Sequence, residues 1–251
     1  MTGETEGKKV GPHGLPIVEV IALTAMRKMI ADHMINSHLA SARVTVLEEM
    51  DVTEFVALRN NLIRDPKKTD GIKISYTHLF IKAIAQSLRK HMMLNSTLVD
   101  NEIHILGDIN VGMAVALPDG NLIVPVIHHA DKKNIVEIAK RAIDIQKRAK
   151  IGKLILDDVQ KGTFTLTNIG MLPESRWTTP IINYPQCAIL GTGAIRQAPM
   201  VLGSEIVIRW VVSMSLTFDH RIVNGLPASL FLQTLSHFLQ EPSTIELGLR
   251  T

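Results

Sequence analysis

The chain has 251 residues, of which 46% are hydrophobic and only 4% aromatic, so aliphatic side chains must fill one sizeable core. Its formal net charge of +3 is spread along the sequence, without the dense basic stripe and stacking aromatics typical of nucleic-acid binding. No apolar run reaches the roughly 18 residues that span a membrane, and the polar N-terminus does not resemble a secretory signal. We therefore expect neither nucleic acid nor a membrane as a partner.

The N-terminal segment differs from the rest of the chain. Residues 2–16 are rich in Gly, Lys, Glu and Pro and lack apolar periodicity. This composition predicts a flexible tail or linker remnant over residues 1–17 and a single domain over residues 18–251. The one cysteine, Cys187, lies in an apolar run and is predicted to be a core residue rather than a nucleophile. It cannot form a disulfide within the chain, which is typical of a reducing compartment.

Helix and strand signals alternate in the first half of the chain. Thr24 is a candidate N-cap for a helix that carries apolar residues on one side. Residues 43–50 are predicted to form a strand, and Asp51 with Glu54 resembles a capping box that opens a second helix. A third helix is expected from about residue 76 to residue 92.

The second half begins with a hairpin signal, because apolar runs at 111–117 and 122–127 flank the turn sequence PDGN. Asn134 with Glu137 then predicts the start of an amphipathic helix that ends before Gly152. Strand-like runs follow, and a last helix is expected. The strand-like runs are 162–167, 186–191 and 206–217, and the last helix is 227–239. This order favours an α/β (α+β) sandwich, a mixed β-sheet with helices on one side.

Single residues give only weak evidence of chemistry. The ten histidines include no Cys/His cluster with zinc spacing, so no metal site is expected. His220 follows a long apolar strand and precedes a turn, and on its own it would be read as a buried core histidine. Thr163, Thr165 and Thr167 alternate along a predicted strand, as in any half-exposed strand. Either feature needs its sequence context to point to a function.

That context is a family resemblance. Residues 219–225, DHRIVNG, resemble the signature Asp-His-Arg-x-x-Asp-Gly of the catalytic domain of dihydrolipoamide acyltransferases, components of 2-oxo acid dehydrogenase complexes. Residues 164–170, FTLTNIG, are similar to its segment Phe-Thr-x-Ser/Thr-Asn-x-Gly. Blocks at 24–34, 112–127 and 179–195 also resemble the family, so the likeness covers nearly everything from residue 18 onward. It implies a chloramphenicol acetyltransferase-like fold.

The resemblance also implies a CoA-dependent acyltransferase with assigned site residues. His220 would be the general base that deprotonates the CoA thiol, and Thr167 of a neighbouring chain would donate a hydrogen bond to the oxyanion. Asn224 stands where the signature has Asp, so Arg27, which resembles an orienting arginine of the family, cannot form a full ion pair with it. Supporting roles fall to Asp219 and Gly225. The expected substrate-channel residues are Leu122, Val124 and Lys132.

The partners and location follow from the same resemblance. CoA is the expected substrate, a lipoyl group would come from another domain or protein, and no metal is required. Trimers assembled into a cubic or icosahedral core, with dehydrogenase or decarboxylase subunits attached, are expected in the cytoplasm or, after processing in a eukaryote, in the mitochondrial matrix. Two alternatives stay open: a structural core scaffold with weak catalysis, and a chloramphenicol acetyltransferase-like enzyme that acylates a small-molecule acceptor.

Overall fold

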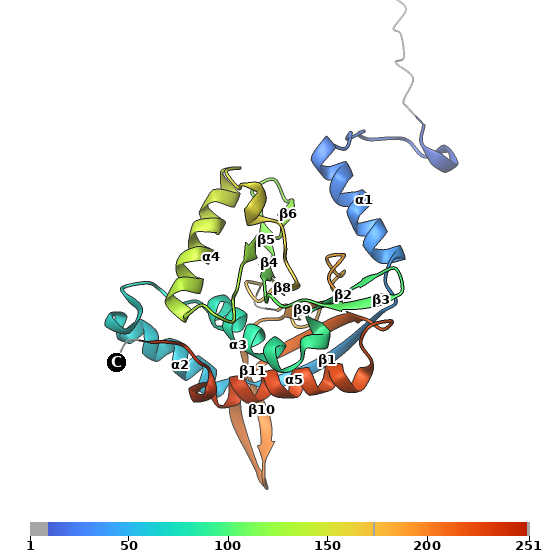
Figure 1. The fold of residues 1–251 in the computed structure, drawn as a ribbon. Coiled ribbons are helices and arrows are strands. Elements are labelled where there is room, and N and C mark those ends of the chain that lie inside the picture. Colours follow the sequence, from blue (N-terminus) through green and yellow to red (C-terminus); the bar gives the residue numbers. More distant parts are fainter. Residues whose placement is uncertain (1–9, 173, 250–251) are drawn as a thin grey trace, which may run out of the picture.

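A mixed seven-stranded sheet with helices packed against it dominates the fold (Figure 1). The computed structural model describes residues 10–172 and 174–249. The strand order is β1-β11-β9-β8-β4-β7, and β10 pairs with the first half of β11. Strand β8 runs parallel to β4 and β9, and the other pairs are antiparallel. The strands are β1 (Arg43–Asp51), β4 (Val111–Met113), β7 (Val126–Ile127), β8 (Phe164–Asn168), β9 (Ala188–Thr192), β10 (Arg196–Leu202) and β11 (Glu205–Asp219).

The helices confirm the expected α/β architecture. Helix α3 is central, since every residue from His78 to Leu88 is buried, and it packs between α4 and α5. Helix α1 lies at the periphery of the fold and exposes most of its side chains (Figure 1). The helices are α1 (Ala25–Leu39), α2 (Thr53–Arg64), α3 (Tyr76–Lys90), α4 (Ile135–Lys150) and α5 (Gly225–Gln240), with 3₁₀ turns η1 (Pro12–Gly14), η2 (Pro66–Thr69), η3 (Met92–Leu94), η4 (Leu156–Asp158) and η5 (Pro242–Thr244).

Two of the three predicted helix caps are confirmed. The Thr24 side chain accepts the N–H of Arg27 at 3.2 Å. Asn134 and Glu137 form the reciprocal capping box, at 2.8 and 2.9 Å. The prediction for Asp51 was wrong: it is the last residue of β1, and Val52 is the N-cap of α2. The Asp51 carboxylate is held by Arg209 at 2.7 Å, so the ion pair keeps this residue in the sheet.

The predicted hairpin at 111–127 is confirmed, but it is interrupted. Strand β4 pairs with β7, and farther out β5 (Val115–Ala116) pairs with β6 (Leu122–Ile123) as a separate ladder. The interruption occurs at Ala114, whose N–H donates to the carbonyl of Leu166 in β8 at 2.9 Å. The hairpin of β2 (Ser96–Val99) with β3 (Glu102–Ile105) was not predicted, because every residue of β3 is exposed and shows no burial alternation.

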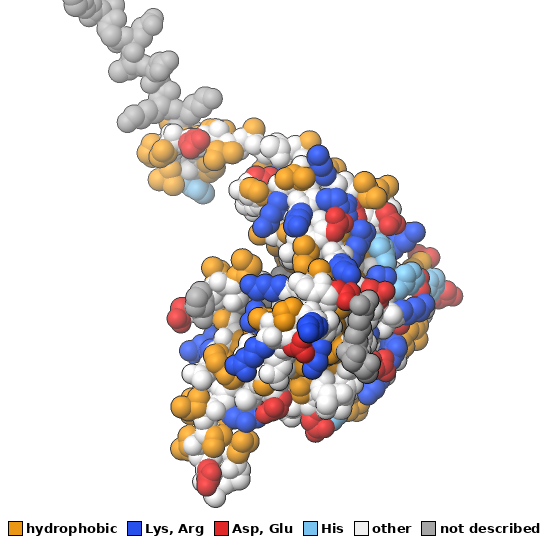
Figure 2. All heavy atoms as spheres, turned by 90° about the vertical axis from the view of Figure 1, so that its left-hand side faces the viewer, with side chains coloured by type: hydrophobic (Ala, Val, Ile, Leu, Met, Phe, Trp, Pro, Cys, Tyr) orange, Lys and Arg blue, Asp and Glu red, His pale blue; other side chains and the backbone are white. Residues whose placement is uncertain are grey.

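The surface carries mixed charge on the side shown in Figure 2, where lysine and arginine side chains are interspersed with acidic and hydrophobic ones. Within the described ranges, none of the helices is long and apolar enough to cross a membrane. Cys187 is fully buried, as predicted. Residues 1–9 of the predicted tail at 1–17 lie outside the described residues. Its described part holds η1 and a bridge between Val10 and Pro16.

Candidate active site

His220 lies directly after β11, at the end of the strand, with its side chain exposed. Its backbone N–H donates to the carbonyl of Ala42 at 2.8 Å, which ties the strand end to the connection between α1 and β1. The imidazole lies near the ring of Phe218, with centroids 5.9 Å apart. Within the described part of the chain, the ring nitrogens have no hydrogen-bond partner. A fixed backbone with an accessible imidazole suits a general base.

The neighbours of His220 in sequence hold this turn together. Asp219 is 3% exposed and accepts two bonds from Nε of Arg221, at 3.0 and 3.1 Å, and one from Nη2 at 2.6 Å. It also accepts the N–H of Ala42 at 3.2 Å, and Arg221 donates to the carbonyl of Ala40. Burial alone would raise the pKa of Asp219, but these hydrogen bonds outweigh it and hold that pKa below its usual value. Asp219 is therefore a charged structural anchor.

The segment 182–187, which was not predicted to be functional, approaches this turn. The N–H of Asp219 donates to the carbonyl of Cys187 at 2.9 Å, so the segment that ends at Cys187 approaches the turn that carries His220. His33 of α1 bonds to Asn183 at 3.0 Å, and Ser37 donates to the carbonyl of Ile182 at 2.5 Å. The C-terminal half of α1 thus fixes the segment that borders His220. No local motif marks this contact, because it joins residues far apart in sequence.

Thr167 lies at a distance from His220 within one chain. In the sheet, Thr167 is paired with Gly191, and Gly191 is paired with Ser215. His220 lies five residues beyond Ser215 along β11. With about 3.3 Å per residue along a strand and about 4.8 Å between strands, the two residues are roughly 19 Å apart. A site that uses both residues must therefore be formed by two chains.

The orienting role that the resemblance implies for Arg27 toward position 224 has no contact behind it in this chain. Arg27 donates instead to Asn121 Oδ1 at 3.1 Å, in the turn between β5 and β6. The reason is geometric: the end of α1 that touches the His220 turn is at Ala40, and Arg27 is about 20 Å away at 1.5 Å of rise per helical residue. Asn224 is the exposed N-cap residue of α5, without a side-chain capping bond, and Gly225 begins that helix.

The three predicted channel residues do not gather around His220. Leu122 lines a cavity of about 330 Å³ between α1 and β6, which Arg27 also lines. Val124 lies under Gly112, where an added Cβ would come within 2.8 Å of its Cγ1. Lys132 is exposed in the turn before α4. They stay candidate channel residues only if a neighbouring chain brings them to the site.

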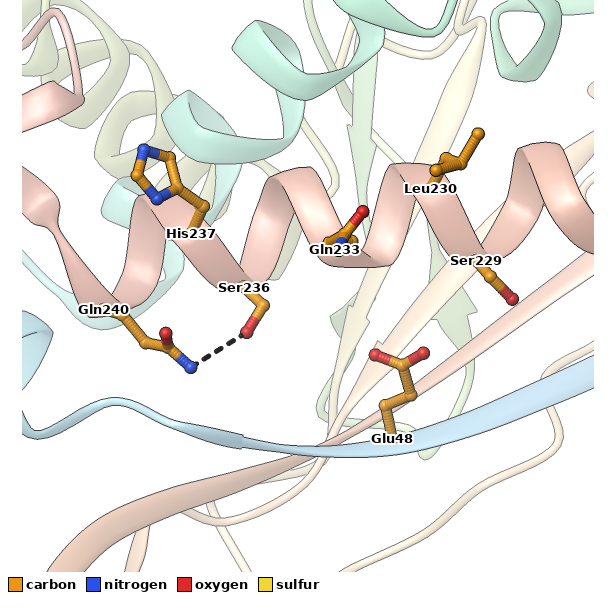
Figure 3. A pocket seen from close by; sticks show the side chains of 7 residues that line it. All are labelled: Glu48, Ser229, Leu230, Gln233, Ser236, His237 and Gln240. Atoms are coloured by element: carbon orange, nitrogen blue, oxygen red, sulfur yellow. Dashed lines mark hydrogen bonds between the residues drawn. The ribbon is translucent and has the colours of Figure 1, made fainter. Parts of the chain in front are cut away.

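A groove of about 490 Å³ lies elsewhere, between β1 and α5 (Figure 3). Glu48 points toward the polar side chains of α5, and burial raises the pKa of its carboxyl group. Gln240 donates to Ser236 at 3.2 Å in the same groove, whereas His237 points away from Glu48. The groove has no paired base and nucleophile. In the described ranges, no three His, Cys, Asp or Glu side chains form a group that could hold a metal ion.

Comparison with known proteins gives a consistent result. The model of the family described as 2-oxoacid dehydrogenases acyltransferase (catalytic domain) matches residues 16–247. The acetyltransferase component of the acetoin cleaving system of Bacillus subtilis (strain 168) is 37% identical over 227 residues, which is 90% of this chain and 56% of that protein. The chain thus spans about half the length of the curated relatives it matches.

Solved structures agree with the sequence comparison. A dihydrolipoamide acetyltransferase of Azotobacter vinelandii, investigated for the catalytic roles of one serine, one histidine and one asparagine, superposes with a TM-score of 0.86 at 30% identity, covering 92% of this chain and 94% of that one. The cubic core of a pyruvate dehydrogenase multienzyme complex also gives 0.86, at 31% identity, with 92% and 94% covered.

A more distant likeness concerns the fold alone. Chloramphenicol acetyltransferase superposes with a TM-score of 0.53 at 12% identity, covering 83% of this chain and 94% of that one. The expected chloramphenicol acetyltransferase-like fold is therefore confirmed.

Proposed function

The chain belongs to the family of 2-oxo acid dehydrogenase acyltransferase catalytic domains, and on that premise we propose that it transfers an acyl group between a dihydrolipoyl thioester and CoA. The observation that carries this proposal is His220, an exposed imidazole on a fixed strand end, four residues before Asn224. The histidine and asparagine investigated in the Azotobacter vinelandii enzyme have the same spacing in their own sequence.

In the proposed step, the imidazole of His220 takes the proton of the CoA thiol while the sulfur attacks the thioester carbonyl. The tetrahedral intermediate carries its negative charge on the former carbonyl oxygen. The hydroxyl of Thr167 from a second chain donates to that oxygen, and one such donor is worth about 2.7–4 kcal/mol. When the intermediate collapses, the dihydrolipoyl sulfur leaves and regains a proton from His220. One thioester replaces another, so positioning and charge stabilisation are what the protein supplies.

Asn224 fits this mechanism as a neutral residue. An amide donates and accepts hydrogen bonds without adding a charge beside the imidazole. The Azotobacter vinelandii acetyltransferase was investigated for the role of an asparagine in its catalytic mechanism. This supports an asparagine at the corresponding place here. We infer that Asn224 orients groups at the His220 turn, and that Arg27 is not its partner within one chain.

We propose that the working unit is an oligomer, with a trimer as the smallest form. The separation of His220 from Thr167 in one chain supports this, as does the likeness to a cubic core. The lipoyl arm would be supplied by another domain or protein, and dehydrogenase or decarboxylase subunits would complete the complex. A location in the cytoplasm or the mitochondrial matrix belongs to the same proposal.

The experiment that tests the function offers acyl-CoA to the assembled protein with separate acceptors. Rapid transfer to free dihydrolipoamide supports the proposal. Transfer to chloramphenicol or a small amine in its place would show a small-molecule acyltransferase, and no transfer to any acceptor would show a structural scaffold. His237→Ala, an exposed histidine of α5, is the matched control for His220→Ala.

A further inference from the structure

The groove between β1 and α5 has a volume of about 490 Å³, within the range of roughly 300–1,000 Å³ that is usual for ligand pockets (Figure 3). Glu48 lines it from β1, and the other lining residues come from α5. They are Ser229, Leu230, Gln233, Ser236, His237 and Gln240. Because residues three or four apart share one face of a helix, the two serines and two glutamines form a single polar stripe that faces Glu48.

Glu48 is the unusual residue of this groove. Side chains alternate between the two faces of a strand, so Glu48 shares a face with Val46 and Met50. Met50 lies in the hydrophobic core and Val46 packs against it, while Met214, the partner of Glu48 on β11, is fully buried. A carboxylate thus occupies a position that the strand pattern assigns to an apolar side chain. Such a departure from the pattern is expected at a functional site.

The carboxylate of Glu48 is half-buried and has no counter-ion. Within residues 10–172 and 174–249, neither a hydrogen bond nor an ion pair reaches it. Burial, which favours the neutral form, raises the pKa of Glu48, and no neighbouring charge opposes this shift. His237, at the rim of the groove, points away from it (Figure 3). A carboxylate that loses water without gaining a partner destabilises the folded state, so the groove lacks a cation that Glu48 is placed to bind.

Other carboxylates on the same strand do have cations beside them. Glu49, the next residue of β1, points to the opposite face and pairs with Arg196. Asp51, at the end of the strand, pairs with Arg209 at 2.7 Å. Among the described residues, neither a lysine nor an arginine lines the groove of Glu48. A counter-ion for Glu48 must therefore come from another molecule.

Helix α5 adds groups that suit a cation. The hydroxyl and amide oxygens of the polar stripe accept hydrogen bonds from N–H donors. The side chains of Ser229 and Gln233 make no hydrogen bond in the described part of the chain, so their oxygens are available to a ligand. Gln240 lies at the C-terminal end of α5, where the helix dipole places partial negative charge. Leu230 supplies an apolar contact for the methylene groups of a ligand.

We propose that this groove binds an alkylammonium group, with Glu48 as its counter-ion and the oxygens of the α5 stripe as further acceptors. An ammonium presents several N–H donors at one point, which matches one carboxylate beside neutral oxygens. The stripe is about 16 Å long at 1.5 Å of rise per helical residue, so an aliphatic chain fits along it. The site is separate from the proposed transfer site: Met214, beside Glu48, lies about 20 Å from His220 along β11.

The test is calorimetric titration of the assembled protein with pentylammonium chloride, with 1-pentanol and with the peptide acetyl-Gly-Lys-Gly-amide. The ammonium should bind, and the alcohol, which has the same chain without the charge, should not. We expect Glu48→Gln to weaken binding of the ammonium about tenfold, by loss of a charge-assisted contact. Glu49→Gln, on the opposite face of the same strand, is the matched control and should bind it as the unaltered protein does. Tighter binding of the peptide than of the ammonium indicates a lysine side chain of another protein as the source, and the reverse order indicates a free amine.

The proposal is overturned if the unaltered protein binds neither the ammonium nor the peptide, if Glu48→Gln keeps full affinity, or if Glu49→Gln loses as much as Glu48→Gln. Urea unfolding separates this role from a structural one. Because burial disfavours the carboxylate, Glu48→Gln should unfold at the same or a higher urea concentration, and a lower midpoint would make Glu48 a structural residue instead. Gln233→Trp, at an exposed position of α5, is a second variant that should fill the groove and abolish binding without unfolding the protein. Retained binding in that variant would place the ammonium elsewhere and overturn the proposal.

Discussion

Arg221 and Asp219 pair with each other across His220, with Nη2 of the arginine 2.6 Å from the carboxylate. Both charges next to the histidine are therefore used in holding the turn, which Arg221 also joins to the end of α1 through the carbonyl of Ala40. The position of the imidazole depends on this pair, although neither side chain bonds to the ring.

Asp219→Asn tests this anchor. The amide keeps the shape but loses the charge, so we expect the free energy of unfolding to fall by about 1–3 kcal/mol, as for a buried hydrogen bond to a charged group. The folded state lowers the pKa of Asp219, so its contribution is present above the usual carboxyl pKa and is lost as the pH falls below it. Urea unfolding at pH 7 measures the change. Glu205→Gln, at the exposed start of β11, should show no such loss.

His220→Ala should lower kcat for acyl transfer by about 10²–10⁴, the usual contribution of a positioned general base. Its side chain is exposed, so the melting temperature and the oligomeric state should not change. Steady-state assay with dihydrolipoamide and sedimentation measure the two properties. Turnover equal to that of the unaltered protein would remove His220 from the mechanism.

Thr167→Ala should lower kcat by about 10²–10³, and Thr167→Ser should retain most of the rate because it keeps the hydroxyl. A mixture of chains carrying Thr167→Ala with chains carrying His220→Ala tests the shared site. The first chain keeps the base and the second keeps the donor. Random assembly in a closed ring then restores roughly one site in four.

The result is compared with each variant assembled alone, which should stay nearly inactive. Activity near a quarter of normal in the mixture requires that His220 and Thr167 act from different chains. A mixture no more active than its parts would place both residues of a site in one chain, against the separation along β8, β9 and β11.

Local sequence signals predicted the elements whose burial pattern is strong. Helix α4 was found with its capping box and apolar face, because both lie within one short segment. Strand β10 was not found, since it contains Pro199 and pairs only with the protruding half of β11. Non-local relations were beyond a single sequence: where α1 packs decides that Arg27 meets Asn121, and strand register decides how far Thr167 lies from His220. For the same reason the sequence did not predict the groove between Glu48 and α5.

Asp158 provides a stability prediction that is independent of the catalytic site. Its side chain is 0% exposed and accepts from Arg141 at 2.7 Å, from two nitrogens of Arg148 and from the N–H of Ile155 at 2.8 Å. The bonds from Arg148, first of all, lower the pKa of Asp158 to about 2. Together they fasten the η4 turn to α4.

Asp158→Asn should therefore destabilise the fold at pH 7, and by about half as much at pH 3, which lies between the folded and unfolded pKa values. A carboxyl pKa lowered from 3.8 to about 2 stabilises the folded state above pH 4, and this contribution is lost as the pH falls toward 2. Because the two arginines are 32% and 23% exposed, solvent screening reduces the expected loss at pH 7 to about 1–2 kcal/mol. Urea unfolding at pH 7 and at pH 3 measures it, with the exposed Asp157→Asn as the control. A loss of the same size at both pH values would mean that the shape of the side chain, and not its charge, holds η4 against α4.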